Sequence, residues 1–139
     1  MAYCTQADLV TRMSETDLVR LTDHDGDGSV DASVAAAAIA DAGGHIDSYL
    51  QVKYTVPLSP VPDVIRKRAA ILSIYFLQLY RDSVTESMQK AFDAVDAWLK
   101  LAAAGKVALG ISPKPAESPG AGGVRYDTQP RIFGRDEPL

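Results

Sequence analysis

The sequence predicts an all-α protein: a small helical bundle of two short N-terminal helices and three longer helices, with an extended C-terminal arm. The first observation is the stretch of residues 62–82, where apolar side chains recur at three- and four-residue steps in two neighbouring stripes. The second is a similar amphipathic pattern in residues 83–104. The third is a shift in composition after Ile111 towards proline and glycine. We therefore expect a helical domain over residues 1–111 and an arm over residues 112–139.

Two short helices are expected at the N-terminus, because a helix-capping pattern occurs twice. Thr5 stands three residues before Asp8, and Ser14 stands three residues before Asp17. Helices this short are not stable alone in water, so both must pack against the longer helices.

The following loop, residues 22–31, is acidic and contains glycine. Its aspartates fall at positions one, three, five and nine of a calcium-binding loop: Asp23, Asp25, Asp27 and Asp31. Gly28 takes position six, but position twelve is Val34, which cannot supply the bidentate carboxylate of such a loop. Two interpretations stay open: a Ca²⁺ site, or a turn whose aspartates bind nearby backbone while Asp31 caps the next helix.

The third expected helix spans residues 31–54, with an apolar face of Ala35, Ile39, Ala42, Ile46 and Leu50. Its first half is rich in alanine, which suits close packing against another helix. His45 lies within this pattern and is expected as a partly exposed helix residue, since no second metal donor is spaced for it. The proline-rich residues 55–62 then form an extended connection.

Residues 62–82 are expected as the central helix, because two apolar stripes need packing partners on both sides. The uninterrupted apolar part is shorter than the roughly 18 to 20 residues that cross a bilayer, so a core helix is expected and no membrane contact. Pro62 suits a helix start. The stripes consist of Ile65, Ala69, Leu72, Phe76 and Leu79, and of Ala70, Ile74 and Leu77.

The last helix is expected to begin after Ser83, with Glu86 three residues further on, and to end at Gly105. Two charge pairs at four-residue spacing mark its wet side: Glu86 with Lys90, and Asp96 with Lys100. Its apolar face contains Met88, Phe92, Val95 and Leu99, widened by Ala91, Trp98 and Ala102.

The C-terminal arm has too few apolar residues to form a core of its own. Its short apolar patches alternate with arginine, a pattern typical of an extended segment that becomes ordered on a partner. The candidate partner-binding residues are Tyr126, Arg131, Ile132, Phe133 and Arg135. A tail without a partner is the alternative.

Charge and reactive residues limit the function classes. The net charge of −4 argues against a body that neutralises nucleic-acid phosphates. The basic run Arg66, Lys67 and Arg68 is either a solvated helix face or a contact for an acidic partner. A single cysteine, Cys4, excludes an intrachain disulfide and, without an apolar leader at the start, points to a reducing, intracellular origin. No set of paired titratable groups indicates an enzyme.

Several short motifs resemble one known family in their order and spacing. They are Tyr3-Cys4-Thr5 with Asp8-Leu9, Leu21-Thr22-Asp23, Ile46-Asp47-Ser48-Tyr49-Leu50 with Tyr54 and Pro57-Leu58, and Arg131-Ile132-Phe133 with Arg135-Asp136. With them the chain resembles the Mu-type phage neck proteins, described as head-tail adaptors or connectors.

This resemblance implies a structural virion protein, located in the neck and, during assembly, in the host cytoplasm. It implies a homo-oligomeric ring, a dodecamer, between the portal protein and a tail-side neck or tail terminator protein. DNA would pass through the lumen without specific binding, and the arm would dock on the portal. Candidate ring contacts are the alanine-rich face of residues 35–42 and the exposed edge of the last helix. The alternative from another class is a calcium-dependent binding module that uses the loop from Asp23 to Asp31.

Overall fold

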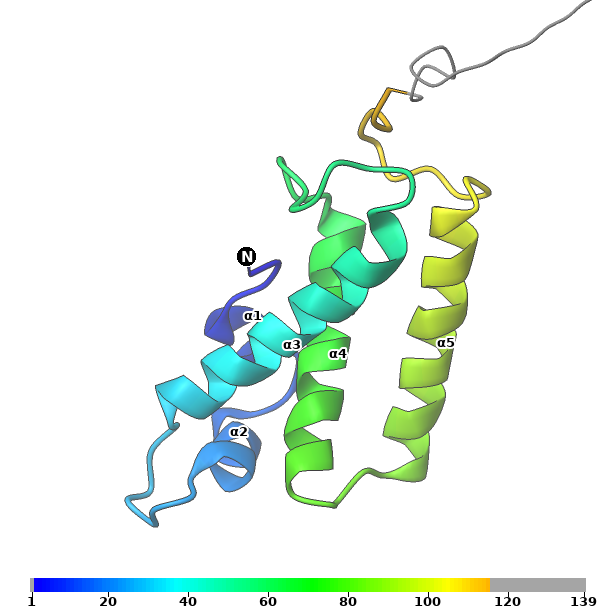
Figure 1. The fold of residues 1–139 in the computed structure, drawn as a ribbon. Helices are drawn as coiled ribbons and strands as arrows, with labels where there is room; N and C mark the ends of the chain where they lie inside the picture. The colour runs from blue at the N-terminus through cyan, green and yellow to red at the C-terminus, as the bar shows by residue number, and fades with distance from the viewer. Residues whose placement is uncertain (1, 116–139) are drawn as a thin grey trace, which may run out of the picture.

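The computed structural model describes residues 2–115, and within that range the chain forms five helices and no strand (Figure 1). Two are short and three are long, which confirms the predicted all-α bundle. Along the chain they are α1 (Gln6–Arg12), α2 (Glu15–Thr22), α3 (Ala32–Leu50), α4 (Asp63–Tyr80) and α5 (Glu86–Ala103). Among these five helices none is long and apolar enough to cross a membrane.

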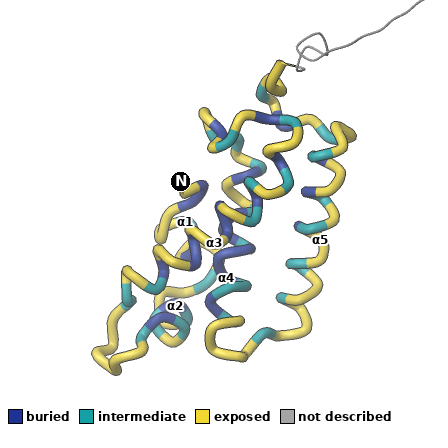
Figure 2. The backbone as a smooth tube through the Cα atoms, viewed as in Figure 1, coloured by how far each residue is buried: buried dark blue, intermediate teal, exposed yellow. Residues whose placement is uncertain are grey.

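Helix α4 is the centre of the bundle, as its two apolar stripes predict. It packs most extensively against α3 and also contacts α1, α2 and α5. Figure 2 shows buried residues along the inner sides of α3 and α4, whereas the outward side of α5 is exposed. The stripe prediction fails at one position, because Leu79 is 47 % exposed. Leu79 lies in the last turn of α4, where a helix that ends at the surface has neighbours on fewer sides.

The helix termini follow the local sequence signals with two exceptions. The first is the end of α3, which lies at Leu50 and not near the predicted Tyr54, because the N–H groups of Lys53 and Tyr54 both donate to the Leu50 carbonyl and close a turn. Thr5 and Asp8 form the predicted reciprocal capping box, and the Ser14 hydroxyl accepts a bond from the Asp17 N–H. Helix α5, however, is capped by Thr85 and not by Ser83. The reason is that the Ser83 N–H and hydroxyl both donate to the carbonyl of Gln78 and so complete the end of α4. Gly105, with φ of +79°, ends α5 as predicted.

The N-terminal segment is anchored inside the bundle by Tyr3. Its hydroxyl donates to the carboxylate of Asp47 in α3 and accepts a 2.9 Å bond from the N–H of buried Leu58. Burial raises the pKa of Tyr3, with the bond to Asp47 acting in the same direction, so the hydroxyl keeps its proton. One side chain thus joins the N-terminus, α3 and the α3–α4 connection.

The chain beyond α5 stays against the body as far as the structure describes it. Leu109 is buried, and Val107 and Ile111 pack against the core. Lys114 donates from its backbone N–H to the carbonyl of Lys53 and from Nζ to the carbonyl of Gln51, at 2.9 and 2.8 Å. The five candidate partner-binding residues lie outside the described range: Tyr126, Arg131, Ile132, Phe133 and Arg135.

Candidate functional site

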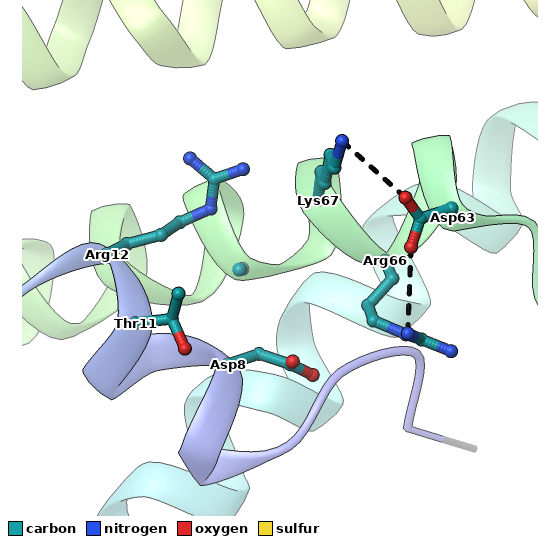
Figure 3. Close-up of a pocket in the computed structure, with 7 residues that line it drawn as sticks. Asp8, Thr11, Arg12, Asp63, Arg66 and Lys67 are labelled. Atoms are coloured by element: carbon teal, nitrogen blue, oxygen red, sulfur yellow. Dashed lines mark ion pairs between the residues drawn. The ribbon is translucent and has the colours of Figure 1, made fainter.

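A basic cleft lies between α1 and the first half of α4 (Figure 3). Its volume is about 450 Å³, and its lining includes Asp8, Thr11, Arg12, Asp63, Arg66 and Lys67. Asp63 pairs with both Arg66 and Lys67, at 3.6 and 3.5 Å. Two charges of the predicted basic run are therefore partly compensated within α4. In Figure 3 the Arg12 and Lys67 side chains point to the same side of the cleft.

A second cleft adjoins the first and shares Arg12 and Lys67 with it. This cleft, the cation slot, has a volume of about 350 Å³ and is lined by Arg12, Lys67, Arg68, Ile71, Ala91, Ala94 and Val95. Its charged lining is entirely cationic, and its remaining lining is apolar and comes from α4 and α5. A site of this kind fits an acidic segment that also presents an apolar side chain.

Arg68 is the cation of the slot whose side chain is fixed by contacts with both α4 and α5. Its guanidinium carbon lies 3.9 Å from the centre of the Trp98 ring, and Nη1 donates to the carbonyl of Val64. Burial lowers the pKa of Arg68, since desolvation disfavours the charged form. Within residues 2–115 neither Arg68 nor Arg12 has a carboxylate partner within 4.0 Å. Within the described range the slot therefore holds two guanidinium groups without a carboxylate partner, one of which lies over an aromatic ring.

The acidic loop brings together three of the four aspartates proposed as calcium ligands. One carboxylate oxygen each from Asp23, Asp25 and Asp27 lies within 4.8 Å of the others. Asp31 is turned away from them, because its Oδ1 accepts bonds from Ser33 and from the Val34 N–H at the start of α3. Its capping role therefore matches the turn interpretation.

The carboxylates of the cluster already accept backbone hydrogen bonds. Asp23 accepts from the N–H groups of Gly26, Asp27 and Gly28 at 2.7, 3.1 and 2.9 Å. The bond from Gly28, with smaller help from its other donors, lowers the pKa of Asp23 to about 2. The hydrogen bond to Asp23 raises the pKa of Asp25. The loop is thus a tight anionic turn whose carboxylate oxygens are partly occupied by its own backbone donors.

The loop is also fixed from outside by Arg81, which follows α4. Its guanidinium donates to the carbonyls of Arg20, Leu21 and Asp23, at 3.1, 3.3 and 2.8 Å. These carbonyls lie at the C-terminus of α2, where a cation is favourable for the helix dipole. The entry into the loop is therefore joined to the end of α4.

A polar group between α3 and α5 was missed by sequence reasoning, which placed Asp96 on the solvent-exposed side of the last helix, whereas its side chain is only 22 % exposed. Asp96 accepts a 2.8 Å bond from the Tyr49 hydroxyl, lies 3.1 Å from His45 Nε2 and pairs with Lys100 at 3.5 Å. Burial opposes ionisation of Asp96, but the bonds from Tyr49 and His45 outweigh it, so its pKa is lowered. The four-residue spacing of His45 and Tyr49 was the available signal. This group fixes α5 to α3.

Comparison with known proteins decides the family. The sequence model of the family described as Bacteriophage Mu, Gp36 matches residues 3–128. The chain belongs to the Mu Gp36 family. It is 31 % identical over 139 residues to gene product J of Escherichia phage Mu, with 99 % of this chain and 97 % of that protein covered. It is 27 % identical over 108 residues to the Mu-like prophage FluMu protein gp36 of Haemophilus influenzae, covering 78 % and 75 %.

Membership in the Mu Gp36 family confirms the expected relation to Mu-type phage proteins. The structure also shows what several motif residues of that resemblance do in this chain. Tyr3, Asp47 and Leu58 form the hydrogen-bonded anchor of the N-terminus, and Cys4 is buried beside Ser73, with 3.6 Å between Sγ and Oγ. Burial raises the pKa of Cys4. These motif residues support the fold.

Proposed function

We propose that this Mu Gp36 family protein is a structural virion component, a head-tail adaptor that forms a ring between the portal protein and the tail. The observation that carries the proposal is the family match over residues 3–128, joined to a small five-helix body. The body supplies shape, and residues 116–139 supply a tether to the portal. We propose no catalytic role for the chain.

The sequence of the arm supports a docking role. Its apolar residues Val124, Tyr126, Ile132 and Phe133 are too few for a core but alternate with arginines. A segment of this composition gains order by lying on a partner surface and can wrap a large area. The arginines would pair with carboxylates of the portal, since a planar guanidinium binds a carboxylate through two parallel bonds.

The outer side of α3 supports side-by-side contact in a ring. Ala35, Ala38 and Ala42 face the core, whereas Ala36, Ala37 and Ala40 are exposed. The predicted contact face of residues 35–42 is thus divided, and its exposed part carries the methyl groups of three alanines. A closed ring needs two different surfaces on each subunit, and this face would be one of them.

Truncation after Pro115 tests the tether. This site is chosen because Lys114 still contacts the body, so a cut at residue 112 would also remove its two bonds, to the carbonyls of Lys53 and Gln51. We expect the shortened chain to keep its helix content and its melting temperature within about 2 °C, since folded-state contacts of the described body remain. We expect it to lose the joining of portal-bearing heads to tails in an infected-cell complementation assay.

A matched control keeps the length of the arm but changes its chemistry. Tyr126→Ser, Ile132→Ser and Phe133→Ser combined should also abolish joining, because the apolar anchors are gone, while scrambling residues 117–122 should not. If the truncated chain supports the same titre of infectious particles as the full chain, the role of the arm is refuted.

The alternative function, a calcium-dependent binding module, is favoured by the converging oxygens of Asp23, Asp25 and Asp27. The adaptor proposal expects titration calorimetry with CaCl₂ to give no saturable heat at micromolar concentrations, since Asp23 already accepts three backbone bonds and Asp31 caps α3. Asp25→Asn is the matched control. Micromolar binding that Asp25→Asn removes would instead establish the module.

A further inference from the structure

Two of the three cations that line the cation slot have no counter-ion among residues 2–115, whereas Lys67 pairs with Asp63. Arg12 and Arg68 have no carboxylate within 4.0 Å among residues 2–115, and no acidic residue appears in the lining of the slot. Arg68 is half-buried against Trp98, so it has lost water without gaining a counter-ion. The chain as a whole has a net charge of −4, so a cluster of cations is opposite in sign to the average charge of the surface. The slot therefore fits an anionic partner.

The acidic loop has an excess of negative charge, opposite in sign to the charge of the slot. Asp23, Asp25 and Asp27 form no ion pair with lysine or arginine among the described residues, although their oxygens converge. The loop residues from His24 to Ser29 are all exposed. Three carboxylates at this spacing repel one another, and a neighbouring guanidinium would relieve that repulsion. The loop therefore fits a cationic partner.

The loop and the slot of one chain cannot meet each other. Arg81 holds the loop at Asp23, and Asp31 is fixed as the cap of α3. Arg68 lies thirteen residues before Arg81, which corresponds to about 20 Å along a helix. In Figure 1 the loop projects from the end of the bundle at which α4 ends. By the bounds of α4, Arg68 lies in the first half of that helix. Two complementary surfaces at different places on one subunit are what a head-to-tail contact requires.

We propose that the acidic loop of one copy, residues 22–31, binds in the cation slot of a neighbouring copy. The inference rests on the proposed function, since it names one contact, beside the outer face of α3, that joins subunits of the ring. Arg68, which lies over the Trp98 ring, would receive one carboxylate through two parallel bonds, and Arg12 and Lys67 would bind the others. The apolar floor of the slot, formed by Ile71, Ala94 and Val95, would pack against the backbone of the loop.

A disulfide ladder tests the contact in phage particles. Full-length chains carry Ser29→Cys in the loop and Ala94→Cys in the slot, and purified particles are oxidised and separated on a non-reducing gel. The proposal expects chains joined into dimers, trimers and longer products. Each single variant should stay a monomer, because a loop cysteine then faces no slot cysteine. The native Cys4 is buried and should not react.

A charge swap distinguishes a specific ion pair from general proximity. Adding Arg12→Glu to the double-cysteine chain should lower the yield of joined products at least about tenfold, the effect of losing one charge-assisted bond. Adding Asp25→Arg as well should restore the yield, a gain that a misfolded chain cannot give. Arg12 is exposed at the end of α1, so its replacement spares the core.

The outcomes separate the two proposals. If the chain is present in particles but the double-cysteine variant gives no ladder, or if Asp25→Arg does not restore the product, the loop-to-slot contact is overturned while the adaptor function stands. If the unmodified chain is missing from purified particles, the adaptor function fails, and the contact fails with it.

Discussion

Replacing Leu72 by alanine is expected to lower the free energy of unfolding by about 3 kcal/mol. Leu72 lies in the middle of α4 and is fully buried. The substitution removes apolar area from the core and leaves a cavity that close-packed neighbours fill only in part. A domain of this size has a total stability of roughly 5–15 kcal/mol, so one cavity would remove a large share of it. Urea unfolding followed by circular dichroism measures the change.

The same substitution at Leu79 is the control, because it changes the same residue type in the same helix. Leu79 is 47 % exposed, and alanine favours a helix, so we expect a change within about 0.5 kcal/mol. Equal losses at Leu72 and Leu79 would contradict the place of α4 at the centre of the bundle.

Tyr3→Phe should cost about 2 kcal/mol although it removes one oxygen atom only. The lost hydroxyl is the acceptor for the buried N–H of Leu58 and the donor to Asp47, and phenylalanine can serve neither. An unsatisfied N–H in the core costs its desolvation energy. Hydrogen exchange at the Leu58 amide should therefore speed up more than exchange in α5, because the anchor of the N-terminus is released.

Tyr75→Phe provides the comparison for this substitution. The Tyr75 hydroxyl makes one exposed bond of 3.4 Å to Gln89, so its loss should change the free energy of unfolding by no more than about 0.5 kcal/mol. If Tyr3→Phe is as mild as Tyr75→Phe, or leaves exchange at Leu58 unchanged, the hydroxyl of Tyr3 does not hold the segment.

The features that sequence predicts well here are those set by residues close in the chain. Helix caps at Thr5 and Ser14, the stop at Gly105 and the i,i+4 pairs of α5 each depend on neighbours within four residues. Apolar spacing also predicts α4 at the centre, because two apolar stripes need packing partners on both sides of the helix. Ser83 is an exception, because its N–H and hydroxyl donate to the Gln78 carbonyl at the end of α4 and do not cap α5.

The features that sequence could not predict join residues from different helices. The stacking of Arg68 on Trp98 and the bonds of Asp96 to His45 and Tyr49 depend on which helix faces meet, and periodicity does not specify that. The basic run of Arg66, Lys67 and Arg68 is visible in the sequence, but the positions of its side chains in the folded protein are not. Asp63 compensates part of the run, whereas Arg68 is carried into a slot that α1 and α5 complete.

Electron cryo-microscopy of purified phage particles would show whether this chain lies between the portal and the tail. We predict a ring of repeated five-helix bodies at that position, with an extended strand of density from each body running onto the portal. Bodies of this fold found only elsewhere in the particle, or a ring whose subunits send no chain to the portal, would contradict it.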